Sequence, residues 1–214
     1  MASSPRISDP QATRWAVAEA KARGWIGQAP LPDHRVDGLR FELVQRRPVG
    51  ARGIAAVVVT DGIATTEVLQ LAAGPRGSLT LGPIWRALRG PWLVVAVDQG
   101  RRRSLHVVDL GQVRGRLYNR RGLARFADGD LTDAATLWEQ AIAADPGLMD
   151  PVYNLACLHT QQGDLERAET ELRWALAMSR TRALRLARGD PDLARLRTVP
   201  SVGSLLGIVP PDRD

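Results

Sequence analysis

The side chains that most often carry out catalysis or bind metals are few in this sequence and far apart. The histidines are His34, His106 and His159, and none has a cysteine, a second histidine or an acidic residue at the spacing of metal ligands. The single cysteine, Cys157, stands among apolar residues of a predicted helix, which indicates a buried and unreactive thiol. The glycines of residues 74–82 match neither phosphate-loop pattern. The sequence therefore predicts no catalytic residue, no metal ligand and no cofactor, and we expect a protein that is not an enzyme.

Arginine is unusually frequent among the basic residues of this sequence. It supplies all but one of the 29 basic residues, since Lys21 is the only lysine. This bias is most simply explained by GC-rich coding, so the number of arginines alone does not indicate a nucleic-acid-binding protein. The formal net charge is +6. It arises entirely in the first half, because residues 1–112 hold 15 basic and 9 acidic residues and residues 113–214 hold 14 of each.

Two groups of arginines could contact a polyanion by following its phosphate backbone. The first belongs to predicted loops of the first half and consists of Arg46, Arg47, Arg52, Arg101, Arg102 and Arg103. The second begins the other half and consists of Arg114, Arg116, Arg120, Arg121 and Arg125. No aromatic side chains interleave with either group, as they do where bases stack on a protein, so a solvated surface is the favoured interpretation. An acidic protein partner fits the same charges.

The elements that must position these groups differ between the two halves. The predicted order in residues 1–112 is helix, three strands, short helix and two strands, at residues 9–27, 39–44, 54–60, 65–72, 81–89, 92–98 and 104–110. The strands are assigned from a two-residue period or from apolar, β-branched composition. Asp61-Gly62 is a strong signal for a hairpin turn. Hairpins favour antiparallel pairing, so we predict an α+β domain with an antiparallel sheet and helices on one face.

Residues 113–214 contain one pattern written twice, 34 residues apart. Gly129-Asp130-Leu131 recurs as Gly163-Asp164-Leu165, and the residues Ala134, Trp138 and Ala141 correspond to Ala168, Leu172 and Ala175. Small residues seven apart share one side of a helix, where two helices can approach closely. After a linker at residues 111–115, we expect helices at residues 116–128, 131–144, 150–162, 165–178 and 182–188. Asp130, Asp150 and Asp164 are the predicted N-caps.

With this period and these helix pairs, about residues 115–206 resemble tetratricopeptide repeats, which are stacked helix–turn–helix units. Tyr118, Gly122 and Pro146 of the first copy, and Leu155 of the second, fall on marked positions of the family's pattern. The resemblance implies an all-α domain over residues 113–214, with two repeats and a helical cap that covers the apolar end of the last repeat. We recognise no family in residues 1–112.

The resemblance also implies a binding surface, because in this family the first helix of each pair lines a concave face. The positions on that face would be Arg116, Asn119, Leu123 and Phe126 in the first repeat, and Asp150, Tyr153, Cys157 and Thr160 in the second. Arg116 and Asn119 are residue types that bind a C-terminal carboxylate in some members, but the set is incomplete here. The alternative is that this face packs against the first half of the chain or against a second subunit.

The sequence thus predicts a non-enzymatic adaptor or scaffold that holds a protein or peptide partner. The predicted partner-binding residues are Arg116, Asn119, Leu123, Phe126, Tyr153, Cys157 and Thr160, and the predicted contacts to an anionic partner are Arg46, Arg47, Arg101, Arg102 and Arg103. A nucleic-acid-binding protein that uses these arginine loops is the alternative, and a homo-oligomer stays open. The N-terminus lacks the apolar segment of a signal peptide, and no apolar run reaches the roughly 18 residues of a spanning helix. We therefore expect a cytoplasmic protein without a membrane partner.

Overall fold

The computed structural model describes residues 21, 29–46, 54–72, 79–88, 90–99 and 102–208. Its backbone divides into two compact units, Met1–Val113 and Arg114–Asp214. An antiparallel sheet region is followed by a helical region, as the fold-class prediction requires. The helix predicted at residues 9–27 lies outside the described residues, apart from Lys21.

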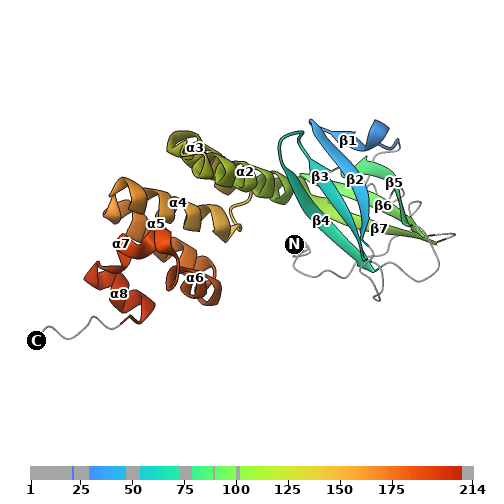
Figure 1. Cartoon of the computed structure of the whole chain (residues 1–214). Helices are drawn as coiled ribbons and strands as arrows, with labels where there is room; N and C mark the ends of the chain where they lie inside the picture. Colours follow the sequence, from blue (N-terminus) through green and yellow to red (C-terminus); the bar gives the residue numbers. More distant parts are fainter. Residues whose placement is uncertain are drawn as a thin grey trace, which may run out of the picture. The chain divides into compact units, whose positions relative to one another are not determined.

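The first unit is built from two antiparallel sheets (Figure 1). The four-stranded sheet has the order β1 (Arg35–Val36), β2 (Leu39–Arg46), β3 (Ile54–Thr60) and β4 (Thr65–Ala72), and the three-stranded sheet has the order β5 (Leu79–Arg86), β6 (Trp92–Gln99) and β7 (Arg102–Asp109). A 3-10 turn, η1 (Pro32–His34), precedes β1. The sheets approach each other where β2 lies next to β5.

The strands follow from their side chains. Five consecutive residues of β6, Leu93–Val97, are buried, so both faces of this strand are covered. A continuous run of apolar and β-branched residues suits such a position. The predicted turn at Asp61-Gly62 joins β3 to β4: the Asp61 carboxylate accepts hydrogen bonds from the N–H groups of Ile63 and Ala64, and Gly62 has a φ of 90°. The hairpin prediction is confirmed.

The short helix predicted at residues 81–89 is wrong, because this stretch contributes the strand β5. Ile84, Trp85 and Leu88 have the spacing of a helical apolar face, but Ile84 and Trp85 are buried beside β6, whereas Leu88 is 62% exposed. The proline of this segment, Pro83, falls within an irregularity of the β5–β6 register, between Leu81 and Ile84. An irregularity tolerates a residue that has no N–H to donate, so proline does not stop the strand.

The linker predicted at residues 111–115 is also wrong. These residues belong to α2 (Leu110–Ala127), which begins directly after β7. The Asp109 carboxylate accepts hydrogen bonds from the N–H groups of Gly111 and Gln112, as an N-cap does. Gly115 has a packing role, because a Cβ atom there would lie 2.7 Å from the Cβ of Asp145.

The second unit continues with helices that match the predicted ones closely. They are α3 (Leu131–Ala144), α4 (Met149–Gln162), α5 (Leu165–Met178), α6 (Arg180–Ala187), η2 (Pro191–Leu193), α7 (Ala194–Arg197) and α8 (Pro200–Leu206). The Asp130 and Asp164 side chains accept hydrogen bonds from the N–H groups of Asp133 and Arg167, which confirms both as N-caps. Asp150 is not an N-cap: α4 begins at Met149, and Asp150 lies in its first turn.

The segment from Arg180 to Ile208, called the C-terminal cap below, completes the core of the helical unit. Its buried residues Leu193, Leu196 and Leu206 pack in one cluster with residues of α4 and α5. Figure 1 shows α6, α7 and α8 gathered beside α4 and α5. The cap therefore covers the apolar end of the helix pair, as the sequence predicted. Of the helices that the structure describes, none combines the length and the apolar character needed to cross a bilayer.

Candidate functional site

The first helix pair is held together by Trp138 of α3. Its indole fills the space left by Gly122 of α2, where a Cβ atom would lie 2.5 Å from the indole nitrogen. The indole N–H donates to the backbone carbonyl of Asn119 at 3.3 Å, and the Phe126 ring packs on the indole with centroids 5.5 Å apart. Phe126 is therefore a partly buried packing residue of the α2–α3 pair.

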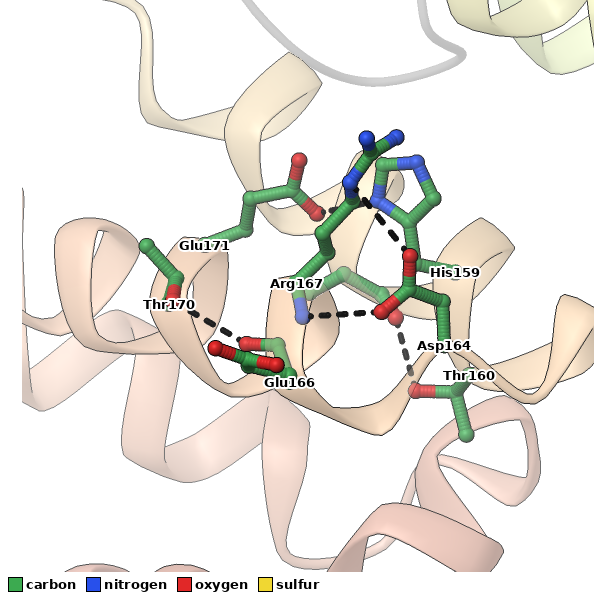
Figure 2. Close-up of polar contacts among 8 residues, drawn as sticks. His159, Thr160, Asp164, Glu166, Arg167, Thr170 and Glu171 are labelled. Atoms are coloured by element: carbon green, nitrogen blue, oxygen red, sulfur yellow. Dashed lines mark hydrogen bonds and ion pairs between the residues drawn. The ribbon is translucent and has the colours of Figure 1, made fainter.

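The second pair repeats this design with smaller groups. Ala168, Leu172 and Ala175 of α5 are fully buried, and Ala156 of α4 takes the place that Gly122 has in the first pair. The turn between the two helices carries polar contacts, shown in Figure 2. The Asp164 carboxylate caps α5 and also pairs with the side chain of Arg167 at 3.3 Å.

Beside this turn, His159 of α4 and Glu171 of α5 form a mostly buried pair. The Nδ1 atom of His159 lies 2.7 Å from Oε2 of Glu171, and Figure 2 shows the two side chains facing each other. Burial raises the pKa of the Glu171 carboxyl, and the hydrogen bond with His159 opposes that shift. His159 thus lies between two helices of the second pair and contributes to their packing.

Comparison with known protein families identifies the same region. A family model described as tetratricopeptide repeat matches residues 125–198. The helical region is a tetratricopeptide-repeat domain. No curated protein matches the chain.

The cap of this repeat domain does more than cover an apolar end, because it engages the predicted concave positions of α4. Asp150 pairs with Arg182 at 2.6 Å. The Tyr153 hydroxyl donates to Oδ2 of Asp190 at 2.8 Å, and the Cys157 thiol lies 3.9 Å from the same oxygen. One turn further on, the amide of Gln161 donates to Asp192 at 3.1 Å. The cap thus occupies this side of α4 along its whole length.

Three predicted partner-binding residues of the second repeat are buried, namely Tyr153 and Cys157 beside the cap, and Thr160. The Thr160 hydroxyl donates back to the carbonyl of Ala156 within α4. Burial raises the pKa values of the Tyr153 hydroxyl and the Cys157 thiol, so both stay protonated at neutral pH. A partner could reach Tyr153 and Cys157 only if the cap moved away.

The cap also brings Cys157, Asp190 and Asp192 together, with one possible ligand atom of each within 4.8 Å of the others. A thiol must lose its proton to bind a metal, and burial raises the pKa of this one. The carboxylates already accept hydrogen bonds from Tyr153 and Gln161. This chemistry suits a hydrogen-bonded contact between the cap and α4 better than a metal centre.

The equivalent side of α2 has a different environment. Arg116, Arg120 and Leu123 are exposed there, and 45% of the Leu123 surface is accessible. Asn119 is partly buried. Its side-chain oxygen accepts a hydrogen bond from the Asn154 amide of α4 at 2.9 Å. Of the predicted concave positions on α2, Arg116 and Leu123 are therefore accessible, and the exposed Arg120 lies one turn from each of them. On α4, Tyr153 and Cys157 are covered by the cap.

The predicted anion contacts of the sheet unit can be placed only in part. Arg47 and Arg101 lie outside the described residues, and so do the side chains of Arg46 and Arg102. Arg103 donates two hydrogen bonds to Asp98, at 2.6 and 2.8 Å. These hydrogen bonds lower the pKa of the Asp98 carboxyl, so the carboxyl is ionised at neutral pH. Its negative charge then balances the positive charge of Arg103.

The contact between the cap and α4 was not predicted from the sequence. The sequence Asp190-Pro191-Asp192 indicates the η2 turn, since the Asp190 side chain caps that turn and proline begins it. The pairing of these carboxylates with Tyr153 and Gln161 joins positions about 30 or more residues apart, which no local pattern shows.

Proposed function

We propose that this chain is a non-enzymatic adaptor that binds a protein partner through the exposed side of α2. Tetratricopeptide repeats generally serve protein–protein interaction or scaffolding and are typically not catalytic. The observation that carries the proposal is the difference between the two halves of the concave face. The cap occupies the α4 half, whereas Arg116, Arg120 and Leu123 leave the α2 half accessible.

Leu123 is the anchor of the proposed contact. A leucine that stays 45% exposed on a helix gains from being covered by a partner, because water leaves its apolar surface. Arginines beside an apolar anchor are common in protein interfaces, where they add hydrogen bonds at the edge. Phe126 and Tyr153 are less suitable as anchors, since Phe126 packs on Trp138 and Tyr153 is covered by the cap.

The chain offers a matched control for this proposal. Trp174 of α5 is also 45% exposed, but it belongs to the second helix of its pair. We would place a photocrosslinking amino acid at position 123 or at position 174 and irradiate cells of the native host. Protein adducts that survive nuclease treatment at position 123, and are absent at position 174, are the expected result. Equal labelling at both positions, or none at position 123, would refute the proposal.

The alternative partner is a nucleic acid bound by the arginine loops, and a photocrosslinking amino acid at position 103 of β7 tests it in the same experiment. Adducts that disappear after nuclease treatment would favour it. The described part of those loops offers little support, because Arg103 is paired with Asp98.

A further inference from the structure

The charge of α2 is unlike that of the rest of the repeat domain. The segment Leu110–Ala127 contains five arginines and no acidic residue, whereas residues 128–214 contain 9 basic and 14 acidic residues. A positive helix next to an acidic remainder creates a local field that favours an anionic partner.

This charge is arranged along one side of the helix. Arg116, Arg120, Leu123 and Ala127 stand at i, i+4, i+7 and i+11, and all four are exposed. Positions with this spacing form a single stripe on a helix. Arg120 forms no ion pair with any residue in the described part of the chain. The stripe, called the α2 stripe below, is basic in its first half and apolar in its second half.

In the second repeat, the equivalent side of α4 is in contact with the cap. A shift of 34 residues places Arg116, Leu123 and Ala127 on Asp150, Cys157 and Gln161. Asp150 pairs with Arg182 of α6, and Cys157 and Gln161 lie against Asp190 and Asp192 of the η2 turn. The counterpart of Arg120 is Asn154, which contacts Asn119 of α2 instead of the cap. The α4 stripe is thus covered by Arg182 of α6 and by the carboxylates of the η2 turn, Asp190 and Asp192. Arg182 of the cap pairs with the negative Asp150 of α4. The equivalent position of α2 is the positive Arg116, so a partner there would need a negative charge.

From the positive charge and the apolar end of this exposed stripe we propose that it binds an amphipathic acidic helix of a partner protein. Carboxylates of that helix pair with Arg116 and Arg120, and an apolar side chain one or two turns further on covers Leu123. The inference rests on the proposed function and specifies the chemistry of its partner. A single helix laid on this stripe buries less area than a standard interface, so binding is weak and sensitive to salt.

The test uses the full chain and synthetic probes. A fluorescein-labelled helical peptide of 16 residues carries Glu at two positions four apart and Leu one turn further along the same side. Matched peptides replace the Glu residues with Gln or with Lys, or scramble the order of the same residues. All have amidated C-termini, so that binding does not depend on a terminal carboxylate. Affinity is measured by fluorescence anisotropy at low and at physiological salt.

The expected result is that the acidic amphipathic peptide binds and that the Gln, Lys and scrambled peptides bind at least about fivefold more weakly. The variant Arg116→Glu/Arg120→Glu should lose the acidic peptide and gain the Lys peptide. The control variant Arg173→Glu, on α5, should bind like the natural chain. A reversal of preference cannot arise from misfolding, so the double variant remains informative.

Other outcomes overturn the inference. Equal binding of the Gln and Glu peptides, or no binding of the acidic one, excludes an acidic helix. Oligonucleotide binding that is lost in the double variant, without peptide binding, would assign α2 to a nucleic acid. Self-association lost in the double variant would assign it to an acidic surface of a second copy. Crosslinking at position 123 without acidic-peptide binding would preserve the proposed function while rejecting this partner class.

Discussion

At the scale of residues, Asp190 determines how the cap meets the second repeat. Its carboxylate accepts hydrogen bonds from the Tyr153 hydroxyl and from the N–H of Asp192, and the Cys157 thiol approaches the same group. The backbone carbonyl of Asp190 accepts a further hydrogen bond from Arg197. One aspartate therefore shapes the η2 turn and attaches it to α4.

We expect Tyr153→Phe to weaken this attachment. The ring stays in place, but Asp190 loses a donor in a partly buried site, which costs about 1–2 kcal/mol of unfolding free energy. Urea denaturation followed by circular dichroism measures the loss. Tyr118→Phe is the matched control, because the Tyr118 hydroxyl makes no hydrogen bond within the described residues, and its effect should stay within about 0.5 kcal/mol. Equal costs for both would contradict the role assigned to Asp190.

The pair of His159 and Glu171 leads to a prediction about pH. Burial raises the folded-state pKa of Glu171 above its ordinary value of 4.5, so the folded chain binds more protons than the unfolded chain just above that value. Stability contributed by this group therefore falls as the pH rises from 4.5 through the raised pKa. Glu171→Gln keeps a hydrogen-bonding oxygen without the charge. Its free energy of unfolding, relative to the natural chain, should increase as the pH rises through this window.

Glu169→Gln is the control, because the pKa of Glu169 is shifted in the opposite direction. A hydrogen bond from Arg173 lowers the pKa of Glu169, so ionised Glu169 contributes stability above pH 4.5 that is lost as the pH falls through its folded-state pKa. Its glutamine variant should lose stability, relative to the natural chain, as the pH rises. Unfolding curves that run parallel to the natural chain for both variants would show that neither pKa shift exists.

At the scale of elements, α2 and α3 depend on a glycine opposite a tryptophan. The absence of a side chain at Gly122 lets the Trp138 indole lie against the backbone of α2, where it also finds an acceptor for its N–H. This is the physical reason for a small residue at this point of the repeat.

Gly122→Ala should therefore destabilise the chain, although alanine is the better helix former. We expect a loss of about 1–3 kcal/mol, because the new methyl group would meet the indole at 2.5 Å. Gly203→Ala in α8 is the control, since a Cβ atom there meets only ordinary contacts at 3.6 and 3.7 Å. That variant should be neutral or slightly more stable in thermal denaturation. A stabilising effect at position 122 would refute the packing described for the first pair.

At the scale of the whole molecule, the chain combines a sheet unit and a helical unit. The sequence placed the boundary at residues 112 and 113, inside what the structure shows to be the continuous helix α2. That the halves are separate domains stays a prediction, supported by the two compact units and by clusters of buried side chains confined to the helical unit.

If the halves are independent domains, a core substitution in one should leave the other unaffected. Phe41→Ala in β2 and Leu196→Ala in α7 both truncate buried side chains and should each cost about 2–5 kcal/mol. Scanning calorimetry should then show each variant shifting a different transition by several degrees. A single transition lowered by both substitutions would mean that the units unfold together.

Predictions from the sequence succeeded where a structure depends on nearby residues. The caps Asp130 and Asp164, the bounds of α3 and α5, and the hairpin at Asp61-Gly62 each rest on a few consecutive positions. They failed where a distant partner outweighed local spacing. The stretch around Ile84 pairs with β6 although its apolar spacing suits a helix, and Gly115 serves helix packing although glycine usually indicates a linker.

The sequence by itself determined the repeat, because a period of 34 residues with small side chains at matched positions specifies which helix faces must meet. It also determined the concentration of arginine in α2. Only the tertiary structure decided which half of the concave face is accessible. That outcome depends on Arg182, Asp190 and Asp192 reaching back to α4, and such contacts form between side chains whose separation along the chain carries no periodic signal. Tyr153 and Leu123 are both predicted positions of the concave face, and the sequence does not distinguish their exposure. The fold buries Tyr153 and leaves Leu123 exposed.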